Sequence, residues 1–541
     1  MPLSRRNLLK SGLAGTASLA LTPLSGWASF IPKRDDGLRF EPYPHPGMPE
    51  LKFAYATDPD GNPFRTLDVE QGRIGTPTDL SQRFGVNARW YVEGFGFVWL
   101  EADNDGRHFS LSEPQERSLN LNFEFARTRV RINNERMARF GATGTTFSSE
   151  VLHLHALSQE LLEDAEKATA AGQAGLADKS LLYALWAAER LELENAHHAI
   201  SRQQRSDHVY FGCETRQYVW AKSEPFVERF TDVFNYATVT HYVWDSWYEV
   251  FEPEEGKHRW GIKDNIVDWL TENNVTIEGR PLFWFHGVVT PDWLKNKSFD
   301  ELKDYVDRHT EALVGHYGDR ISHWEVVNEY HDWANIHNHT PEQITEITRQ
   351  ACEKTHEVNP NIVRIINNCC PFGNYASYRY NSEGPADRPL RTPHQFVRDI
   401  VDAGVPFEVV GVQMYFPQRD LQQIIRLIEH FEQFGKPVQI TEIGATSGPT
   451  TGTVRAGEMK LQDHLYDWRR PWDEDLQADW LEELYTLFYS KPWIEAINWY
   501  DFADFRTFIR NGGLVREDLS TKQSYDRLHN LLGRWNRLPS P

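Results

Sequence analysis

Apolar and polar residues alternate in short runs over residues 32–150. The clearest run is ARWYVEGFGFVWL at 88–100, and turn-forming clusters such as DPDGNP at 58–63 separate the runs. Strict alternation places successive side chains on opposite faces of a half-buried strand. We extend this pattern through LNLNFEF at 119–125 and VRI at 130–132. The segment is therefore predicted to form an all-β, sandwich-like domain.

The period changes to that of a helix over residues 151–205. Apolar residues such as Leu181, Leu185 and Ala188 recur at helical spacing, and the Ala-rich stretch 168–172 interrupts the pattern. Apolar positions three and four residues apart lie on one face of a helix. Two helices are therefore expected to connect the β domain to the rest of the chain.

Residues 206–536 alternate short apolar runs with amphipathic helical stretches. Eight runs are candidate strands, near Val209, Tyr236, Leu282, Trp324, Ile365, Val410, Val438 and Ile497. Eight β/α units predict a TIM (β/α)₈ barrel, whose active site lies at the C-terminal ends of the strands. Polar and aromatic side chains fall at those ends, namely Asn328, Glu329, Asn367, Gln413, Glu442 and Trp499.

The first 30 residues have the pattern of a leader. Arg5 and Arg6 precede a weakly apolar run that extends to about Leu24, and small residues near Ala28 suit cleavage. This pattern is typical of a twin-arginine export signal, with a Sec-type signal as the alternative. No later segment approaches the about 20 apolar residues of a membrane span. We expect an exported protein, periplasmic or secreted, without stable membrane insertion.

Charge narrows the classes of partner. The chain of 541 residues carries a formal net charge of −21, which disfavours nucleic acid and anionic membrane surfaces as partners. A neutral ligand fits better. The four cysteines, Cys213, Cys352, Cys369 and Cys370, are too few for a disulfide framework, although one bridge remains open. Nothing in the sequence fixes the oligomeric state.

Two groups of histidines are the candidates for a metal centre. His331, His337 and His339 lie close together in the sequence, as do His153 and His155. Neither group is joined by a cysteine or carboxylate at a recognisable ligand spacing. No metal or other cofactor is therefore expected.

Two predicted strands end in a carboxylate. One is HWEVVNEY at 323–330 and the other is QITEIG at 439–444. Two carboxyl groups about 5 to 5.5 Å apart are the equipment of a retaining glycosidase, in which one protonates the leaving oxygen and the other attacks the sugar carbon. The pair therefore predicts glycoside hydrolysis.

The motif YGDRI at 317–321, followed by WEVVNE at 324–329, resembles glycoside hydrolase family 10, the β-1,4-xylanase family. The resemblance covers about 206–536 and implies a barrel-shaped catalytic domain. Further matching segments are Phe211-Gly212, EPEEG at 252–256, ITE at 440–442, GLV at 513–515, Lys522 and Tyr525.

The resemblance also implies roles for individual residues. Glu329 is the general acid/base, which must hold a proton, and Glu442 is the nucleophile, which must stay ionised. Asn328 is expected to face the 2-hydroxyl of the sugar at the cleavage point, and Gln413 to lie near the nucleophile. Trp499 is expected to form a stacking platform under that sugar, with core packing as the alternative.

Four departures from the family fall on sugar contacts. Residues 240–247, THYVWDSW, replace the Glu, Asn and Lys that precede a Trp in the family. This chain has WFHG at 284–287 where the family has Trp-His-Ser-Gln, so His286 matches the family His only if one residue is inserted. Tyr415 replaces a His, and its hydroxyl can donate to the nucleophile but cannot carry a positive charge at neutral pH. Tyr500 replaces a Gly, and we expect it to narrow the cleft.

Two functions from different classes follow. The first is a retaining β-1,4-xylanase, or a hydrolase of another β-glycan, whose β domain binds carbohydrate or acts as a spacer. The second is a non-hydrolytic glycan-binding protein, and a metal-dependent exported oxidoreductase is a distant third. Two carboxylates buried side by side repel each other, and a binding protein has no need of them. The enzyme is therefore favoured, while the glycan and the choice between endo and exo attack stay open.

Overall fold

The computed structural model describes residues 37–45, 51–114, 116–202, 209–245, 250–415, 419–448 and 468–539. The predicted leader at residues 1–30 lies outside this part. Within it, none of the helices has both the length and the apolar character needed to cross a membrane. All four cysteines are described, and none of them is in a disulfide, so the bridge that the sequence left open is not formed.

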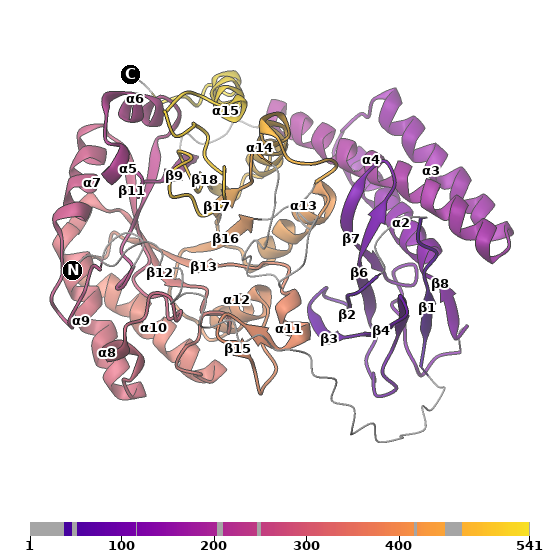
Figure 1. Cartoon of the computed structure of the whole chain (residues 1–541), viewed down its shortest axis with the longest axis horizontal. Coiled ribbons are helices and arrows are strands. Elements are labelled where there is room, and N and C mark those ends of the chain that lie inside the picture. Colours follow the sequence, from indigo (N-terminus) through magenta and orange to yellow (C-terminus); the bar gives the residue numbers. More distant parts are fainter. Residues whose placement is uncertain are drawn as a thin grey trace, which may run out of the picture.

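The N-terminal region contains two four-stranded sheets (Figure 1). One has the order β4 (Asp68–Glu70), β5 (Arg73–Gly75), β1 (Arg39–Glu41) and β8 (Ser118–Asn120), and the other has the order β3 (Pro63–Thr66), β2 (Ala54–Thr57), β6 (Gly85–Val92) and β7 (Gly96–Ala102). Apolar residues of both sheets, among them Phe40, Ile74 and Val86, belong to one buried cluster. The alternation predicted these sheets correctly up to residue 120.

The strand prediction beyond residue 120 is wrong, because Leu121–Ala142 forms helix α2. The Asn120 side chain accepts a hydrogen bond from the Phe123 backbone N–H and caps this helix, as Asn often does. Leu121 and Phe125 are both buried. Their spacing of four suits one helix face as well as alternate positions of a strand, so the apolar pattern did not separate the two.

Two further helices follow, α3 (Ser149–Lys167) and α4 (Ala170–Arg202). They are the two helices predicted over 151–205, and the break falls at Ala168 and Thr169. Buried residues of α2 and α4, including Phe125, Leu181 and Leu185, belong to the same cluster as the sheets. The helices therefore contribute to the N-terminal core, and α4, whose Ala196 belongs to the barrel core, also connects that region to the barrel.

The larger part of the chain is a closed barrel of eight parallel strands (Figure 1). The strands are β9 (Tyr210–Glu214), β10 (Tyr236–Thr240), β11 (Thr276–Arg280), β12 (His323–Asn328), β13 (Val363–Asn368), β16 (Val409–Tyr415), β17 (Val438–Gly444) and β18 (Ile494–Trp499). All eight predicted strands are present, although Leu282 lies just after β11 rather than within it. The sequence prediction of a TIM barrel is confirmed.

Helices between the strands surround the barrel (Figure 1). They are α5 (Tyr218–Ala221), α6 (Glu224–Val233), α7 (Gly261–Glu272), α8 (Asp292–Lys295), α9 (Phe299–Tyr317), α10 (Pro341–Val358), α11 (Asn374–Tyr378), α12 (Pro393–Asp402), α13 (Leu421–Phe431), α14 (Glu474–Tyr489) and α15 (Gln523–Arg534). Capping boxes at Ser298 and Thr340 fix the starts of α9 and α10, because each satisfies backbone N–H groups that the first turn leaves free.

Buried polar contacts join the N-terminal region to the barrel at the segment that follows β16. Arg129 of α2 forms a bidentate pair with Asp420, with both N···O distances 2.7 Å. Arg419 donates to the Tyr55 hydroxyl at 2.7 Å, and Gln423 donates to the Trp99 carbonyl at 2.8 Å. These contacts fix residues 419–423 at the start of α13 against the N-terminal region.

Candidate active site

Glu329 and Glu442 lie at the C-terminal ends of strands β12 and β17. Glu329 directly follows β12 in a left-handed conformation, with φ of 57°, and its backbone N–H donates to the Asn367 carbonyl at 2.9 Å. Glu442 lies two residues before the end of β17 and is opposite Gln413 of β16 in register. Both glutamates are buried, with 7% and 4% exposed. A non-glycine residue held at positive φ is strained, and such strain often marks a functional site.

One amide network joins the two carboxyl groups. Gln413 donates to Glu329 Oε1 at 2.9 Å and lies 3.3 Å from Asn328 Oδ1. Asn367 donates to Asn328 Oδ1 at 3.1 Å and reaches Glu442 Oε1 at 3.4 Å. The two glutamates therefore belong to one site, and Asn328 lies between them in the network.

The surroundings of Glu329 favour its protonated form. Burial and, after it, the charge of Glu442 raise the pKa of Glu329 to about 7, against the opposing hydrogen bonds from Gln413 and Trp284. Trp284 Nε1 donates to Glu329 Oε2 at 3.0 Å. A buried carboxyl group that is protonated near neutral pH is suited to act as a general acid.

Both oxygens of the Glu442 carboxylate accept hydrogen bonds. Arg280 donates to Oε1 and Tyr415 donates to Oε2 at 2.6 Å. Asn367 reaches the same oxygen as Arg280. Charge-assisted hydrogen bonds of this kind fix the position of a carboxylate. Glu442 is thus the firmly held carboxylate, which suits a nucleophile, while Glu329 is the carboxyl group whose pKa is raised, which suits an acid.

Sequence reasoning missed Arg280, the last residue of β11. Its guanidinium is 1% exposed and lies between Glu442 and Glu325, 3.6 Å from Glu325 Oε2. Burial raises the pKa of Glu325 well above its usual range, although Arg280 opposes this. The rule that polar side chains gather at strand ends would have found Arg280, but its strand was predicted near Leu282.

The residues predicted around the two carboxylates are mostly brought together. Asn328 and Tyr415 lie in the network as expected, and Tyr415 donates to the nucleophile candidate. Gln413 pairs with Glu442 in register, but its amide group bonds Glu329 instead. The His286 Nδ1 accepts a hydrogen bond from the Val288 backbone, and its ring centre lies 4.8 Å from that of Trp284, which bonds Glu329.

Trp499 does not offer the open platform that was predicted. Its side chain is 1% exposed, its Nε1 donates to the Gly512 carbonyl at 2.9 Å, and its ring packs on Trp480. The alternative of core packing is the one the structure has. The next residue, Tyr500, stacks instead over Arg280, 5.4 Å from the guanidinium carbon to the ring centre. Tyr500 also contacts Phe508, whose side chain is 53% exposed.

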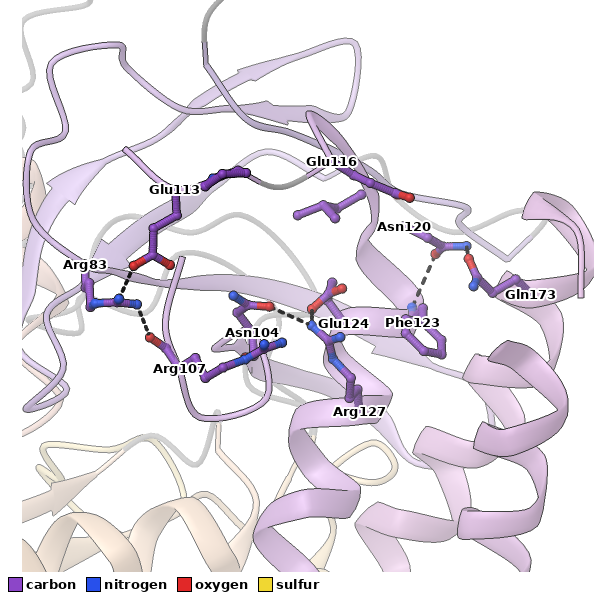
Figure 2. A pocket seen from close by; sticks show the side chains of 12 residues that line it. Arg83, Asn104, Arg107, Glu113, Glu116, Asn120, Phe123, Glu124, Arg127 and Gln173 are labelled. Carbon is purple, nitrogen blue, oxygen red and sulfur yellow. Dashed lines mark hydrogen bonds and ion pairs between the residues drawn. The ribbon is translucent and has the colours of Figure 1, made fainter. Parts of the chain in front are cut away.

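A second concave region lies far from these carboxylates, in the N-terminal region (Figure 2). This hollow of about 570 Å³ is bounded by β-domain loops and the first turns of α2. Its polar groups pair with one another, as in Arg83 with Glu113 and Arg127 with Asn104 at 3.1 Å. Phe123 adds an aromatic ring to the wall.

The model of glycosyl hydrolase family 10 matches residues 200–530. This chain belongs to that family. It is 26% identical over 208 residues to a β-1,4-xylanase of Dictyoglomus thermophilum, covering 36% of this chain and 53% of that protein. It is 21% identical over 307 residues to endo-1,4-β-xylanase B of Thermotoga neapolitana, covering 55% and 78%. This family 10 chain therefore spans about half the length of the Dictyoglomus relative.

Among solved structures, xylanase 10B of Thermotoga petrophila in complex with xylobiose is 21% identical to this family 10 chain. The match covers 61% of this chain and 95% of that one, with a TM-score of 0.46.

A further curated relative is the exoglucanase XynX of Acetivibrio thermocellus. It is 25% identical over 238 residues, which is 40% of this chain and 21% of that protein.

The family departures at residues 240–247 have structural explanations where they are described. His241 is buried, and its Nε2 lies 3.2 Å from the Tyr317 hydroxyl. Tyr242 packs on Trp284 with ring centres 4.9 Å apart. His241 is thus a core residue of this family 10 barrel, while Tyr242 supports the tryptophan that bonds Glu329. Residues 246–249 lie outside the described part.

Proposed function

We propose that this protein is a retaining glycoside hydrolase that cleaves β-1,4-linked glycans, with xylan as the first substrate to test. The observation that carries the proposal is the contrast between Glu329, whose pKa burial raises to about 7, and Glu442, which Arg280, Asn367 and Tyr415 hold. The curated relatives named as xylanases support the choice of substrate.

Two displacements follow from this geometry. In the first, a Glu442 oxygen attacks the anomeric carbon while Glu329 gives its proton to the departing glycosidic oxygen. The C–O bond to the leaving sugar breaks, and a covalent glycosyl ester forms on Glu442. In the second, Glu329 takes a proton from water, the water oxygen attacks the anomeric carbon, and the ester bond breaks to restore Glu442.

Neighbouring side chains serve these steps. Glu442 is an anion before it attacks and becomes one again when the ester bond breaks. Tyr415 and Arg280 stabilise its charge at both points. The Asn328 amide belongs to the same hydrogen-bond network, and we expect it to hydrogen-bond a hydroxyl of the sugar. Such a contact accelerates the reaction if it strengthens in the transition state. Tyr500 fills the space over Arg280 and narrows the site.

The decisive experiment is product analysis by mass spectrometry. Wild-type protein and its Glu442→Ala variant are incubated with xylan and with a panel of other β-glycans. Short xylo-oligosaccharides from the wild type alone support the proposal. Products from another glycan instead identify that glycan as the substrate. A folded protein that binds a glycan but cleaves none supports the second candidate, a glycan-binding protein, which the burial of Trp499 favours.

The carbohydrate-binding role of the N-terminal region stays a prediction, and the hollow in Figure 2 is the place to test it. The Phe123→Ala variant should bind insoluble xylan less well than wild type if that region holds glycan. If insoluble xylan retains wild type and Phe123→Ala equally, the N-terminal region is assigned the role of a spacer. The proposed location, exported to the periplasm or secreted, rests on the leader pattern and is tested by fractionating cells that express an Arg5→Lys, Arg6→Lys variant.

A further inference from the structure

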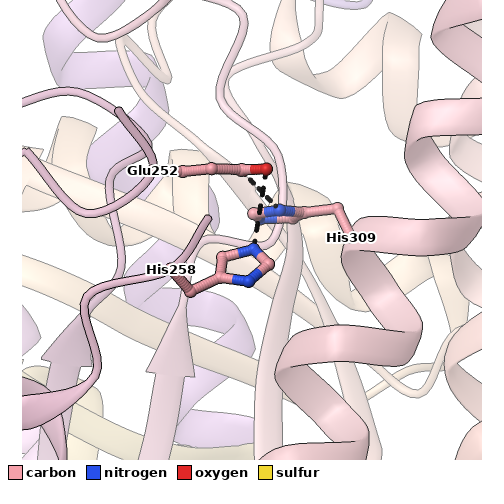
Figure 3. Close-up of side chains that lie close together, drawn as sticks. All are labelled: Glu252, His258 and His309. Atoms are coloured by element: carbon pink, nitrogen blue, oxygen red, sulfur yellow. Dashed lines mark ion pairs between the residues drawn. The ribbon is translucent and has the colours of Figure 1, made fainter. Parts of the chain in front are cut away.

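Three side chains from two separate segments of the sequence converge outside the active site (Figure 3). Glu252 and His258 lie in the segment between β10 and α7, and His309 lies in the middle of α9. All three side chains are buried, with exposed fractions of 1%, 8% and 0%. Within the described part of the chain, this is the one group of three such ligands within reach of a single ion.

The spacing of their ligand atoms suits one metal ion. Glu252 Oε2 lies 3.1 Å from His309 Nδ1, and Glu252 Oε1 lies 3.6 Å from His258 Nε2. All three ligand atoms lie within 4.8 Å of one another. Nitrogen and oxygen ligands that each lie about 2.0 to 2.2 Å from one zinc ion are roughly 3 to 4 Å apart. A small closure of the group therefore brings all three into coordination distance.

One of these atoms is buried without a hydrogen-bond partner. His258 Nε2 faces Glu252, but 3.6 Å is too long for a hydrogen bond. A buried polar nitrogen left unsatisfied is costly. A cation between His258 and Glu252 would satisfy both the imidazole lone pair and the carboxylate charge.

The surrounding groups are arranged as supports for a bound carboxylate. The Gly256 backbone N–H donates to Glu252 Oε1 at 2.7 Å, and the Tyr305 hydroxyl donates to Oε2 at 2.8 Å. Tyr305 lies one turn before His309 on α9 and is 3.0 Å from its Nδ1. Such contacts fix the orientation of ligands around a metal.

We propose that Glu252, His258 and His309 bind one divalent transition-metal ion, for which Zn²⁺ is the best match. Two imidazoles and one carboxylate suit zinc, with water or the Tyr305 hydroxyl in the fourth position. The ion joins the segment after β10 to α9. The Glu252 backbone N–H donates to the Val243 carbonyl at 3.0 Å. The bound ion therefore also stabilises the segment that carries Tyr242, the residue that packs on Trp284. This role is structural and does not depend on the proposed hydrolysis.

The sequence-based expectation of no metal did not include this group. The histidines considered there are bonded elsewhere, for example His331 to the Tyr375 hydroxyl at 2.7 Å and His155 to Asn134 at 2.7 Å. Glu252, His258 and His309 have no recognisable spacing, and only the barrel brings α9 against the segment after β10.

Metal binding is tested on the full-length protein after treatment with EDTA and removal of the chelator. Zinc chloride is titrated into wild type, His258→Gln and His316→Gln, with calorimetry for stoichiometry and thermal unfolding for stability. His316 is the matched control, because it lies on the same helix and pairs with Asp264 at 2.8 Å without a third ligand.

We expect wild type and His316→Gln to bind one zinc per chain, with a melting temperature that rises on zinc addition. His258→Gln should bind at least about 10-fold more weakly while its far-UV circular dichroism matches that of the wild type. The proposal is overturned if wild type takes up no stoichiometric zinc, or if His258→Gln binds zinc as tightly as wild type. If His258→Gln does not fold, His258→Asn replaces it in the same comparison.

Discussion

Tyr415 donates a 2.6 Å hydrogen bond to Glu442 Oε2, while Arg280 donates to the other oxygen of the same carboxylate. The two donors come from β16 and β11, and together they engage both oxygens of the nucleophile candidate. An oxygen that must attack carbon is thus held in position before the substrate arrives, which is the arrangement that preorganised catalysis requires.

Removing the Tyr415 hydroxyl should slow catalysis without unfolding the protein. In Tyr415→Phe the Glu442 carboxylate loses one donor, so we expect kcat to fall by about 10- to 100-fold, with a smaller change in KM. Steady-state kinetics on a xylo-oligosaccharide measure this. Tyr500→Phe is the control, because it keeps its ring over Arg280. A kcat of Tyr415→Phe within twofold of wild type would show that the bond does not matter for turnover.

The pKa of about 7 at Glu329 predicts the alkaline limb of the activity profile. The acid must be protonated, so kcat/KM should decrease as the pH rises through about 7. Glu329→Gln should abolish this limb and slow cleavage of unactivated glycans by several orders of magnitude, yet spare aryl glycosides whose leaving groups need no proton. A wild-type profile that is flat to pH 9 would contradict the assignment.

The same shift has a consequence for stability. The folded-state pKa of Glu329 lies above the ordinary value of 4.5, so its contribution favours the fold at low pH and is lost as the pH rises through about 7. Ionising the buried group then costs up to about 3 kcal/mol. Glu329→Gln should therefore raise the melting temperature at pH 8 relative to wild type, but not at pH 5. A gain in melting temperature at pH 5 but not at pH 8 would show that Glu329 is not the group with the raised pKa.

Arg280 should matter for both stability and turnover. In Arg280→Met, Glu442 and Glu325 lose their buried cation, so we expect about 3 to 5 kcal/mol less stability. Glu442 also loses the donor to Oε1, so kcat should fall by about 10- to 100-fold. Urea unfolding and steady-state kinetics measure the two effects. If Arg280→Met keeps the wild-type kcat, Arg280 does not position Glu442 for attack.

The N-terminal region should unfold together with the barrel. Arg129 and Asp420 are 3% and 0% exposed, and breaking such a buried bidentate pair leaves an unpaired charge. Arg129→Met should therefore cost about 3 to 5 kcal/mol of unfolding free energy. Arg139→Met, at a pair whose Arg is 54% exposed, should cost less than about 1 kcal/mol. Equal small losses in both variants would make the N-terminal region an independent module.

The sequence predicted what depends on local period and chain order. Eight apolar runs placed Glu329, Glu442 and Gln413 at strand ends, and a parallel barrel necessarily brings such ends together. Helix α2 was missed because Leu121 and Phe125 fit either period. The burial of Trp499 and the contact of Arg280 with Glu442 depend on residues distant in the sequence, which no local pattern reports.

The most direct test of the account is to trap the glycosyl enzyme with an activated 2-deoxy-2-fluoro-xylobioside, since the fluorine slows both displacements and a good leaving group restores the first. Intact-mass and peptide mass spectrometry then locate the adduct. The account predicts one xylobiosyl unit per chain, attached to Glu442, and none in Glu442→Ala. An adduct on another residue, or hydrolysis of substrate with inversion at the anomeric carbon, would contradict it.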